Sequence, residues 1–546
     1  MRKTKIICTM GPATDSDEVL EKLMRGGMNV ARFNFSHGSH EEQKERMDRI
    51  KAMREKCGKP VAMLLDTKGP EIRTGIFEEG KVTLEPGQQF VLTGREIRGN
   101  ASMASITYPQ LYQDEKPGNR ILIDDGLIEL IVKEIRGEDI ICTVVNGGVI
   151  SNHKGVNVPG VHIHLPYMSE KDKEDILFGI RQDIDFVAAS FTRTAEDVMQ
   201  IRKLLDENGG KDINIIAKIE NAEGVDKIDE IIRVSDGIMI ARGDMGVEVP
   251  DEEVPVIQKM IIRKVYEAGK QVITATQMLD SMMKNPRPTR AETTDVANAI
   301  YDGTSAIMLS GETAAGKYPV EAVRTMDAIA RKTESNVERI CPAKTPKRTR
   351  LSITAATAHA ACTTAEDIGA DAILTVSQRG ITAQMVSRFR PAATVVALLL
   401  DPQVQRQMAL YWGLVPITMP RASSTDQLVD LAIQSAQEAG LVKHGDLVVV
   451  TAGVPVGISG TTNMIRIAQV GGALVNAIGI GSQTASGPLC ICRTLEEIPE
   501  KFHPGDVLVV PYTNNDVVPW LRQAAAIVSE EASADCHTAT VGYFFC

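Results

Sequence analysis

A lysine and two carboxylates stand at the ends of two apolar runs between residues 215 and 244. The run IIAKIE carries Lys218 and Glu220, and the run GIMIARGD ends with Asp244. Side chains two residues apart on a strand point to the same face, so Lys218 and Glu220 are expected to project together. At the carboxyl end of a parallel sheet, such a group can bind a metal ion and an anion. Taken alone, the three charges fit equally well with strand ends that merely reach solvent.

Other apolar runs in the first 340 residues also end in polar side chains. The segments VARFNFSHG, LLDTKGPEIRTG, ATQM and MLSGET contribute Arg32, Asn34, Ser36, Asp66, Thr67, Glu71, Arg73, Thr276, Gln277, Ser310 and Glu312. By strand alternation, Arg32, Asn34 and Ser36 are expected on one face. Each of these residues taken alone fits a purely structural role as well as a functional one. If all of them meet at one rim, a purely structural role for the whole set becomes much less plausible.

The residue types indicate the chemistry of this rim. Arginines suit phosphate or carboxylate oxygens, and carboxylates beside such cations indicate a hard divalent ion such as Mg²⁺. Asn34, Ser36, Asp66 and Thr67 offer oxygen ligands with a single charge, which suits a monovalent cation. The set favours phosphoryl transfer, which needs charge neutralisation and positioning more than covalent chemistry. A GxxxxGK[ST] loop is absent from the sequence, which excludes a P-loop enzyme.

Eight apolar runs of strand length supply the framework for these residues. They are KIICTM, NVARFNF, VAMLLDT, DFVAASF, INIIAKIE, GIMIARGD, QVITATQM and SAIMLSGE. Most precede a helical pattern, as Val225, Ile228, Ile231 and Ile232 predict for one helix after Glu220. Eight such units predict a (β/α)8 TIM barrel formed by residues 1–71 and 166–340, and an open doubly wound sheet is the alternative.

Residues 72–165 interrupt the barrel after its third strand. Their patterns, such as RILIDDGLIELIVKEI, are those of β-strands punctuated by glycine, which predicts a small inserted β domain. A domain attached at the functional face of a barrel is well placed to be a lid, with a passive insertion as the alternative. His153, His162 and His164 have strand spacing and are interpreted as β surface rather than as a metal cluster.

The second half of the chain predicts two further domains. Residues 340–350 contain two prolines and four basic residues and are interpreted as a linker. Helices then alternate with strands to about residue 471, which predicts a doubly wound α/β domain over 341–471. Residues 472–546 start Gly-rich and continue with the strands VLVV and AAIVSE, a short extra α/β segment.

Composition limits the class of protein. The 546 residues are too many for one core, and 43% hydrophobic with 24% charged residues is ordinary for a globular protein. A net charge of −11 argues against nucleic-acid binding. The longest apolar runs are strand-length, so neither a membrane span nor a secretory signal is expected. The nine cysteines are scattered, with Cys490 and Cys492 the only close pair, which indicates reduced thiols and a cytoplasmic protein.

The motifs together resemble the pyruvate kinase family. The likeness covers residues 1 to about 471 and rests on IICTMGPAT, VARFNFSHG, LLDTKGPEIRTG, AKIEN, ARGDMGVE, ATQMLDSM and PRPTRAETTDVANAIYDGTSAIMLSGETAAGKYPVEAV. It implies a barrel (A domain), an inserted β-barrel lid (B domain) and a regulatory C domain. It also implies transfer of the phosphoryl group of phosphoenolpyruvate to ADP, giving pyruvate and ATP, with Mg²⁺ (or Mn²⁺) and K⁺. Members of the family are usually homotetramers.

The resemblance assigns roles to individual residues. It implies that Glu220 and Asp244 bind the divalent ion and that Lys218 stabilises the phosphoryl group in flight. It implies K⁺ binding by Asn34, Ser36, Asp66 and Thr67, while a glutamate at Glu71 marks the K⁺-dependent members. Thr276 matches the proton-transferring threonine. Arg32 and Arg73 match phosphate-binding arginines, and Arg32, Arg73, His37 and Lys171 are expected to contact the nucleotide. Backbone N–H groups of Gly243 and Asp244 are expected to hold the substrate carboxylate at a helix start.

The effector region departs from the family pattern. The stretch LTVSQRGITAQ, residues 374–384, is two residues longer than the usual phosphate loop. Ser377, Arg379 and Thr382 remain the candidates to bind a sugar-phosphate or nucleotide effector. The Gly-rich stretch GVPVGISGTTN, residues 453–463, resembles bacterial members.

Residues 472–546 resemble the phosphohistidine domain of phosphoenolpyruvate-utilising enzymes. His537 aligns with the histidine of a Thr-Ser-His-Ala pattern, but the text here is Asp-Cys-His-Thr, and the strands expected after it are missing. We expect a structural or vestigial role, with phosphorylation of His537 as the alternative. For the whole chain, two other functions stay open. One is a barrel lyase or aldolase that forms a pyruvate enolate, and the other is a catalytically silent metabolite sensor.

Overall fold

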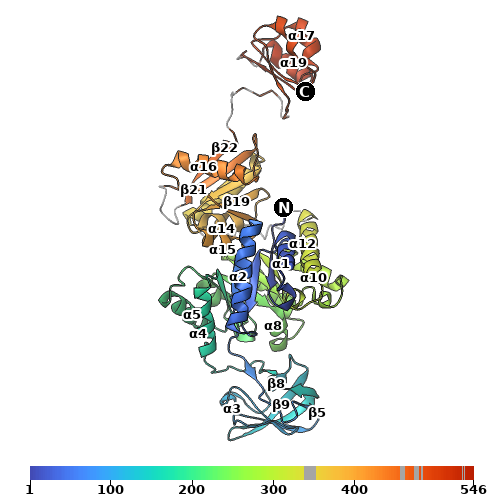
Figure 1. Ribbon diagram of the computed structural model, residues 1–546, viewed down its shortest axis with the longest axis vertical. Coiled ribbons are helices and arrows are strands. Elements are labelled where there is room, and N and C mark those ends of the chain that lie inside the picture. Colours follow the sequence, from blue (N-terminus) through green and yellow to red (C-terminus); the bar gives the residue numbers. More distant parts are fainter. Residues whose placement is uncertain are drawn as a thin grey trace. The chain divides into compact units, whose positions relative to one another are not determined.

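The structure is a computed structural model that describes residues 1–336, 352–454, 462–471, 477, 479–480, 484–531, 533 and 535–545. The chain divides into two compact units, Met1–Val470 and Gly471–Cys546 (Figure 1). The predicted linker at 340–350 lies outside the described residues.

The first unit contains the predicted closed barrel. Its eight parallel strands follow the order β1-β17-β16-β15-β14-β13-β3-β2, which confirms closure over the open-sheet alternative. Alternate side chains fill the interior, among them Ile7, Leu64 and Phe186, while their neighbours pack against the helices. The strands are β1 (Lys5–Thr9), β2 (Val30–Asn34), β3 (Ala62–Asp66), β13 (Phe186–Ala189), β14 (Asn214–Ile219), β15 (Gly237–Ala241), β16 (Gln271–Ala275) and β17 (Ala306–Leu309).

Helices surround the barrel, and several begin with a capping box. Ser39 and Glu42 form the capping box of α2, and α4, α5 and α10 start in the same way. The helices are α1 (Asp17–Gly26), α2 (His40–Cys57), α4 (Glu170–Arg181), α5 (Ala195–Glu207), α8 (Arg242–Glu248), α9 (Val254–Glu267), α10 (Arg290–Tyr301), α11 (Gly311–Ala314) and α12 (Pro319–Asn336).

The prediction of a single helix after Glu220 is wrong in one respect. The segment forms two short helices, α6 (Ala222–Asp226) and α7 (Ile228–Val234). Asn221 caps α6 by accepting a hydrogen bond from the N–H of Gly224, and a Cβ on Gly224 would lie 2.6 Å from the carbonyl oxygen of Thr192. This close approach fixes the first turn, and the second helix then buries its isoleucines against the barrel.

The inserted segment is a β domain, as predicted. Seven strands form one sheet in the order β4-β12-β8-β9-β10-β6-β7, and β5 pairs with β11 in a separate sheet. Its bounds are β4 (Ile72–Arg73), β5 (Lys81–Leu84), β6 (Gln89–Thr93), β7 (Met103–Ser105), α3 (Leu111–Asp114), β8 (Arg120–Ile123), β9 (Ile128–Arg136), β10 (Asp139–Asn146), β11 (Gly148–Ser151) and β12 (Gly155–Asn157).

The domain contacts the barrel at the helix that follows β15. Asn157 donates a hydrogen bond of 2.9 Å from Nδ2 to Oε1 of Glu248, the last residue of α8. The three histidines are not in strands, contrary to their predicted spacing. His153 lies in a turn, His162 lies 3.2 Å from Glu223, and His164 lies 2.7 Å from Asp114.

The C domain has a five-stranded sheet in the order β20-β19-β18-β21-β22. Its parallel part confirms the doubly wound pattern, whereas antiparallel β22 was not among the predicted strands. The elements are α13 (Ile353–Asp367), β18 (Ala372–Val376), α14 (Ile381–Arg388), β19 (Thr394–Leu399), α15 (Pro402–Met408), β20 (Leu414–Thr418), α16 (Thr425–Glu438), β21 (Leu447–Gly453) and β22 (Thr462–Gln469).

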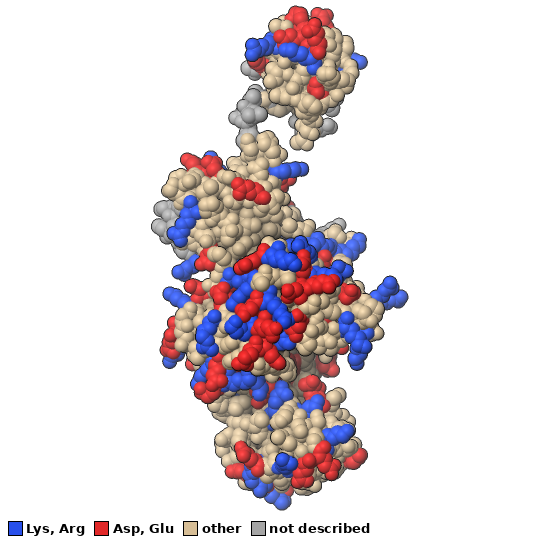
Figure 2. Space-filling model, in the orientation of Figure 1, with Lys and Arg blue, Asp and Glu red and all other residues tan. Residues whose placement is uncertain are grey.

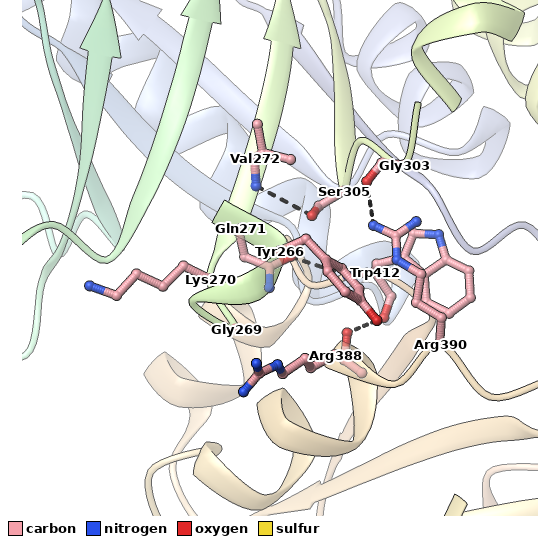
Figure 3. Close-up of a pocket in the computed structure, with 11 residues that line it drawn as sticks. Tyr266, Gly269, Lys270, Gln271, Val272, Gly303, Ser305, Arg388, Arg390 and Trp412 are labelled. Atoms are coloured by element: carbon pink, nitrogen blue, oxygen red, sulfur yellow. Dashed lines mark hydrogen bonds between the residues drawn. The ribbon is translucent and has the colours of Figure 1, made fainter. Parts of the chain in front are cut away.

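Cationic side chains join the C domain to the barrel. The guanidinium of Arg390 lies 4.8 Å from the centre of the Trp412 ring and donates to the carbonyl of Gly303, beside a small pocket (Figure 3). Arg406 forms a buried ion pair of 2.8 Å with Asp185. The two domains therefore share polar contacts that a separately tethered module would lack.

The second unit is a small α/β fold. Parallel strands β23 (Leu489–Ile491), β24 (Val507–Val510) and β25 (Ala526–Ser529) form its sheet, and it also holds α17 (Ile498–Lys501), α18 (Val518–Leu521) and α19 (His537–Phe545). His537 begins α19, with Nδ1 lying 2.7 Å from the Thr513 hydroxyl and Nε2 lying 3.1 Å from Oδ1 of Asn515.

The barrel surface carries charges of both signs. On the face shown in Figure 2, Lys and Arg side chains alternate with Asp and Glu over the barrel helices, where pairs such as Arg49–Glu45 connect successive turns of α2. None of the described helices is long and apolar enough to cross a membrane. Seven cysteines fall within the described ranges, and all are free thiols.

Candidate active site

Lys218 lies at the centre of the predicted group, buried near the carboxyl end of β14. Its ammonium is 3.1 Å from Oδ1 of Asp66 and 3.0 Å from Oε1 of Glu220, and it donates at 2.8 Å to the hydroxyl of Ser190. Burial alone would lower the pKa of Lys218, but the two carboxylates outweigh it and raise that pKa. The lysine is therefore a fixed cation at this position.

Asp66 connects the lysine to an arginine from a neighbouring strand. Its Oδ2 accepts from Nε of Arg32 at 2.5 Å, and the hydroxyl of Thr9 accepts from Nη1 of Arg32 at 3.0 Å. Burial would raise the pKa of Asp66, but Arg32 and Lys218 together hold it below its usual value. One carboxylate thus fixes both cations.

Glu220 and Asp244 form the acidic side of the site. The Glu220 carboxyl is buried and accepts the N–H of Phe191 at 2.5 Å. Burial raises the pKa of Glu220 to about 7, opposed by Lys218 and reinforced by the charge of Asp244 in the first turn of α8. Two repelling carboxylates with oxygen donors suit Mg²⁺, which takes one or two carboxylates and completes its shell with substrate oxygens and water. The described part of the chain contains no cluster of three or more Asp, Glu, His or Cys side chains arranged as metal ligands.

Thr276 is held in a strained backbone conformation directly after β16. Its φ is +69°, which is rare for a β-branched residue, and strain of this kind concentrates at functional sites. Its hydroxyl accepts the N–H of Gly243 at 2.7 Å. In this structure the threonine hydroxyl therefore occupies the Gly243 N–H that is expected to hold the substrate carboxylate, and the role of Gly243 stays a prediction.

The oxygen ligands predicted at β2 and β3 lie side by side, with one correction. Asn34 pairs in register with Asp66, since both end their strands. Ser36 does not continue the alternation, because β2 ends at Asn34 and the N–H of Ser36 donates to Oδ1 of Asn34 in a turn. The Thr67 hydroxyl donates to the carbonyl of Ala188 at 3.2 Å.

The remaining predicted residues lie in the inserted domain, in the turn after β2 and in α4. Arg73 belongs to strand β4 of the inserted domain and pairs through Nε with Glu71 at 2.7 Å. His37 is exposed in the turn after β2. Lys171 bonds to Asp175 at 2.6 Å and to the carbonyl of Phe35 at 3.0 Å, so it lies beside the same turn.

Three contributors were missed from the sequence. Ser190 and Phe191 follow β13, a strand that had been recognised without any residue being assigned at its end. Arg242 forms two contacts of 2.7 Å with Asp295 and donates to the carbonyl of Thr276 at 2.9 Å. The position of Ser190 at the end of a barrel strand is a sequence signal for a site residue. The contact of Arg242 with Asp295 joins residues far apart in the sequence, so no sequence signal predicts it.

The effector candidates lie around the start of α14. Ser377 and Arg379 are in the loop after β18, with Arg379 exposed. Thr382 is buried in the first turn, where its hydroxyl lies 2.7 Å from that of Thr462. Most of the Gly-rich stretch at 453–463 lies outside the described residues, so its predicted role stays a prediction.

A TIM barrel whose mouth holds two cationic side chains on a shared carboxylate, beside a pair of acidic side chains, is typical of enzymes that act on anionic substrates. Comparison with known proteins makes this specific. Residues 1–323 match the description "Pyruvate kinase, barrel domain", and residues 355–468 match "Pyruvate kinase, alpha/beta domain". The chain belongs to the pyruvate kinase family. Residues 502–543 match "PEP-utilising enzyme, mobile domain".

Individual relatives agree. A pyruvate kinase of Geobacillus stearothermophilus is 51% identical over 544 residues, covering 99% of this chain and 93% of the relative. One of Clostridium acetobutylicum is 54% identical over 473 residues, covering 86% of this chain and all of the relative. The crystal structure of a pyruvate kinase from Cryptosporidium parvum has a TM-score of 0.81 at 38% identity, covering 86% of this chain and 96% of that one.

Proposed function

We propose that the barrel mouth transfers the phosphoryl group of phosphoenolpyruvate to ADP, giving pyruvate and ATP. The observation that carries this proposal is the junction at Lys218, whose ammonium meets Asp66 and Glu220 while Arg32 holds the other side of Asp66. Phosphoryl transfer needs fixed positive charge where negative charge moves, and a buried lysine with a raised pKa supplies it without reorganisation.

Two cation sites belong to this proposal. Glu220 and Asp244 would hold Mg²⁺ (or Mn²⁺), which supplies charge neutralisation of the substrate oxygens when bound. Asn34, Ser36, Asp66 and Thr67 would hold K⁺ close to Arg32. The adjacency of Asn34 and Asp66 in register supports this second site.

Residues on the other side of the barrel rim would bind the substrate carboxylate and supply the proton that the enolate takes up. Thr276 would deliver the proton to the enolate carbon, and its strained backbone directs the hydroxyl toward α8. Asp244 and Gly243 would hold the carboxylate through backbone N–H groups, with the Gly243 N–H exchanging the Thr276 hydroxyl for the substrate. Arg73 and Arg32 would bind phosphate oxygens, and Arg32, Arg73, His37 and Lys171 would contact the nucleotide.

The inserted domain would close over the substrates. Its turn at Asp124 and Asp125 lies close to α8, since a Cβ on the next residue, Gly126, would lie 4.0 Å from Cγ1 of Val247. Burial and then the charge of Asp244 raise the pKa of Asp125. The hydrogen bond between Asn157 and Glu248 supports the same placement. A passive insertion would have no reason to bring a carboxylate toward Asp244.

Regulation, assembly and compartment are further parts of the proposal. Ser377, Arg379 and Thr382 would bind a sugar-phosphate or nucleotide effector through the loop before α14. We infer a cytoplasmic homotetramer: membership of the pyruvate kinase family supports the assembly, and the free thiols of the described cysteines support a reducing compartment. Sedimentation of the purified protein should give four chains per particle, and a monomer would contradict the inference.

Coupled assays test the proposed reaction. Pyruvate formation from phosphoenolpyruvate should require ADP, Mg²⁺ and K⁺ together. Turnover without ADP would favour the lyase or aldolase alternative, and absence of turnover would favour the sensor.

A further inference from the structure

Ser190 is the third partner of the Lys218 ammonium and has no assigned role. It follows β13 directly and its side chain is buried, with 1% exposed surface. Its hydroxyl accepts from Lys218 at 2.8 Å and lies 3.0 Å from Oδ1 of Asp66 and 2.6 Å from the carbonyl oxygen of Thr67. The hydroxyl has one hydrogen, so it donates to one of these two oxygens while accepting from the lysine.

The backbone around Ser190 fixes this hydroxyl in place. The Ser190 N–H donates to the Thr67 hydroxyl at 3.1 Å, and its carbonyl accepts from the Tyr167 hydroxyl at 3.1 Å. Gly69 packs against it so closely that a Cβ there would lie 2.9 Å from the Ser190 Cβ. A side chain bound on every side keeps one rotamer, which is the condition for orienting a neighbour.

The residue after Ser190, Phe191, contacts the carboxylate of Glu220. Phe191 has a φ of +52°, and this conformation directs its N–H to Oε2 of Glu220. Two successive residues after β13 therefore contact both Lys218 and Glu220. The position of this loop determines how the lysine and the carboxylate face each other.

Among the three partners of Lys218, Ser190 is the neutral one. Asp66 and Glu220 are proposed cation ligands, so bound ions would share their oxygens. The neutral Ser190 hydroxyl would keep the ammonium in place when cations bind the carboxylates. We propose that Ser190 is a positioning residue that orients Lys218 toward the phosphoryl group in transfer.

This inference rests on the proposed role of Lys218 and predicts a particular kinetic pattern. The effect should fall on kcat, because the lysine acts on charge that moves in the transition state, while Arg32 and Arg73 bind the ground-state phosphate. Ser190→Ala is expected to lower kcat by about 10–100-fold and to leave KM for phosphoenolpyruvate and ADP within about threefold. Ser190→Cys, which keeps a weak acceptor of similar shape, should recover part of the loss.

The test uses the full chain and a matched control from the same loop. Thr192 is as buried as Ser190 and its hydroxyl donates to the carbonyl of Ala189 at 2.9 Å, with no contact to Lys218. Thr192→Val should therefore keep kcat within about threefold. Thermal midpoints of all variants show whether any loss of turnover reflects loss of fold.

Each outcome decides the inference. A Ser190→Ala enzyme with unchanged kcat, with a raised KM alone, or with a loss that Ser190→Cys does not relieve would overturn it. Lys218→Met in the same assay distinguishes a failure of the proposed function of Lys218 from a failure of the proposed role of Ser190. If Lys218→Met keeps full turnover, the proposed function of the lysine fails; if Lys218→Met is inactive and Ser190→Ala is normal, only the role of Ser190 fails.

Discussion

The Nζ atom of Lys218 lies 3.0 Å from Oε1 of Glu220, so the proposed phosphoryl-stabilising cation is in contact with a proposed metal ligand two residues away. This relationship predicts the result of removing the charge. Lys218→Met should bind phosphoenolpyruvate with little change but lower kcat by about 10²–10⁴-fold. Steady-state kinetics and calorimetric binding measure the two effects, and Lys211→Met, an exposed site before β14, is the control. Near-normal kcat would contradict the assigned role.

A single charge reversal should change the dependence on K⁺. Glu71 pairs with Arg73 at 2.7 Å beside the proposed K⁺ ligands. In Glu71→Lys, the new ammonium would supply positive charge where the monovalent ion acts, so activity without K⁺ should rise by at least about tenfold. Loss of this partly buried ion pair would release Arg73, a proposed phosphate-binding residue, so activity with K⁺ should fall by a few-fold. Turnover measured in Na⁺-free, K⁺-free buffer tests this, and a variant still fully dependent on K⁺ would refute it.

The sequence predicted the barrel and most of the site because both depend on local patterns. Buried parallel strands are continuous apolar runs, and their ends are fixed by the chain, so Lys218, Glu220 and Asp66 could be placed at one rim. Ser36 was misplaced because a strand ended two residues earlier, where an asparagine side chain captured its N–H. The break between α6 and α7 falls at Lys227, which caps both helices, and no periodicity encodes it.

The side-chain contacts within the site could not be predicted from the sequence, because they too depend on the tertiary structure. Arg242 with Asp295, and Ser190 with Lys218, join residues whose proximity exists only after the barrel closes. The use of the Gly243 N–H by Thr276 likewise follows from a backbone angle that the sequence does not reveal.

The inserted β domain, residues 72–165 and the proposed lid, should lose stability as pH rises. Glu115 has 3% exposed surface, one oxygen bonded to Asn119 and the other buried without a partner in the described structure, and burial raises its pKa to about 7. Its folded pKa therefore exceeds the unfolded value, so the folded state binds the proton more tightly. Stability is fully present below about pH 4.5 and falls as pH rises toward 7.

Glu115→Gln removes this titration. The variant should match the parent at pH 4.5 and exceed it at pH 8 by about 1–2 kcal/mol in the free energy of unfolding of the lid. Hydrogen exchange within residues 72–165 at both pH values measures the difference. Glu85→Gln, an exposed site in the same domain, is the control. Equal pH dependence in parent and Glu115→Gln would show that Glu115 is not the group responsible.

The second unit should be dispensable for turnover. It is compact by itself from Gly471 onward, and the Clostridium acetobutylicum pyruvate kinase aligns over its whole length with only 86% of this chain. A chain ending at Val470 should keep kcat within about twofold, because all proposed site residues precede it. Kinetics of the shortened protein test this; a loss above tenfold with an intact fold would assign the unit a role in catalysis.

Phosphorylation of His537 is tested separately. Its ring nitrogens lie against Thr513 and Asn515, which supports a structural role. Incubation of the full chain with phosphoenolpyruvate labelled in its phosphoryl group should leave no label on His537. A labelled phosphohistidine absent from His537→Ala would revive the alternative.

The most direct measurement of the whole account is pyruvate formation from phosphoenolpyruvate by the purified full chain, with ADP, Mg²⁺ and K⁺ each omitted in turn. We predict turnover with all three components and a loss of at least about tenfold when any one is missing. Pyruvate released at the same rate without ADP, or no pyruvate with every component present, would contradict it.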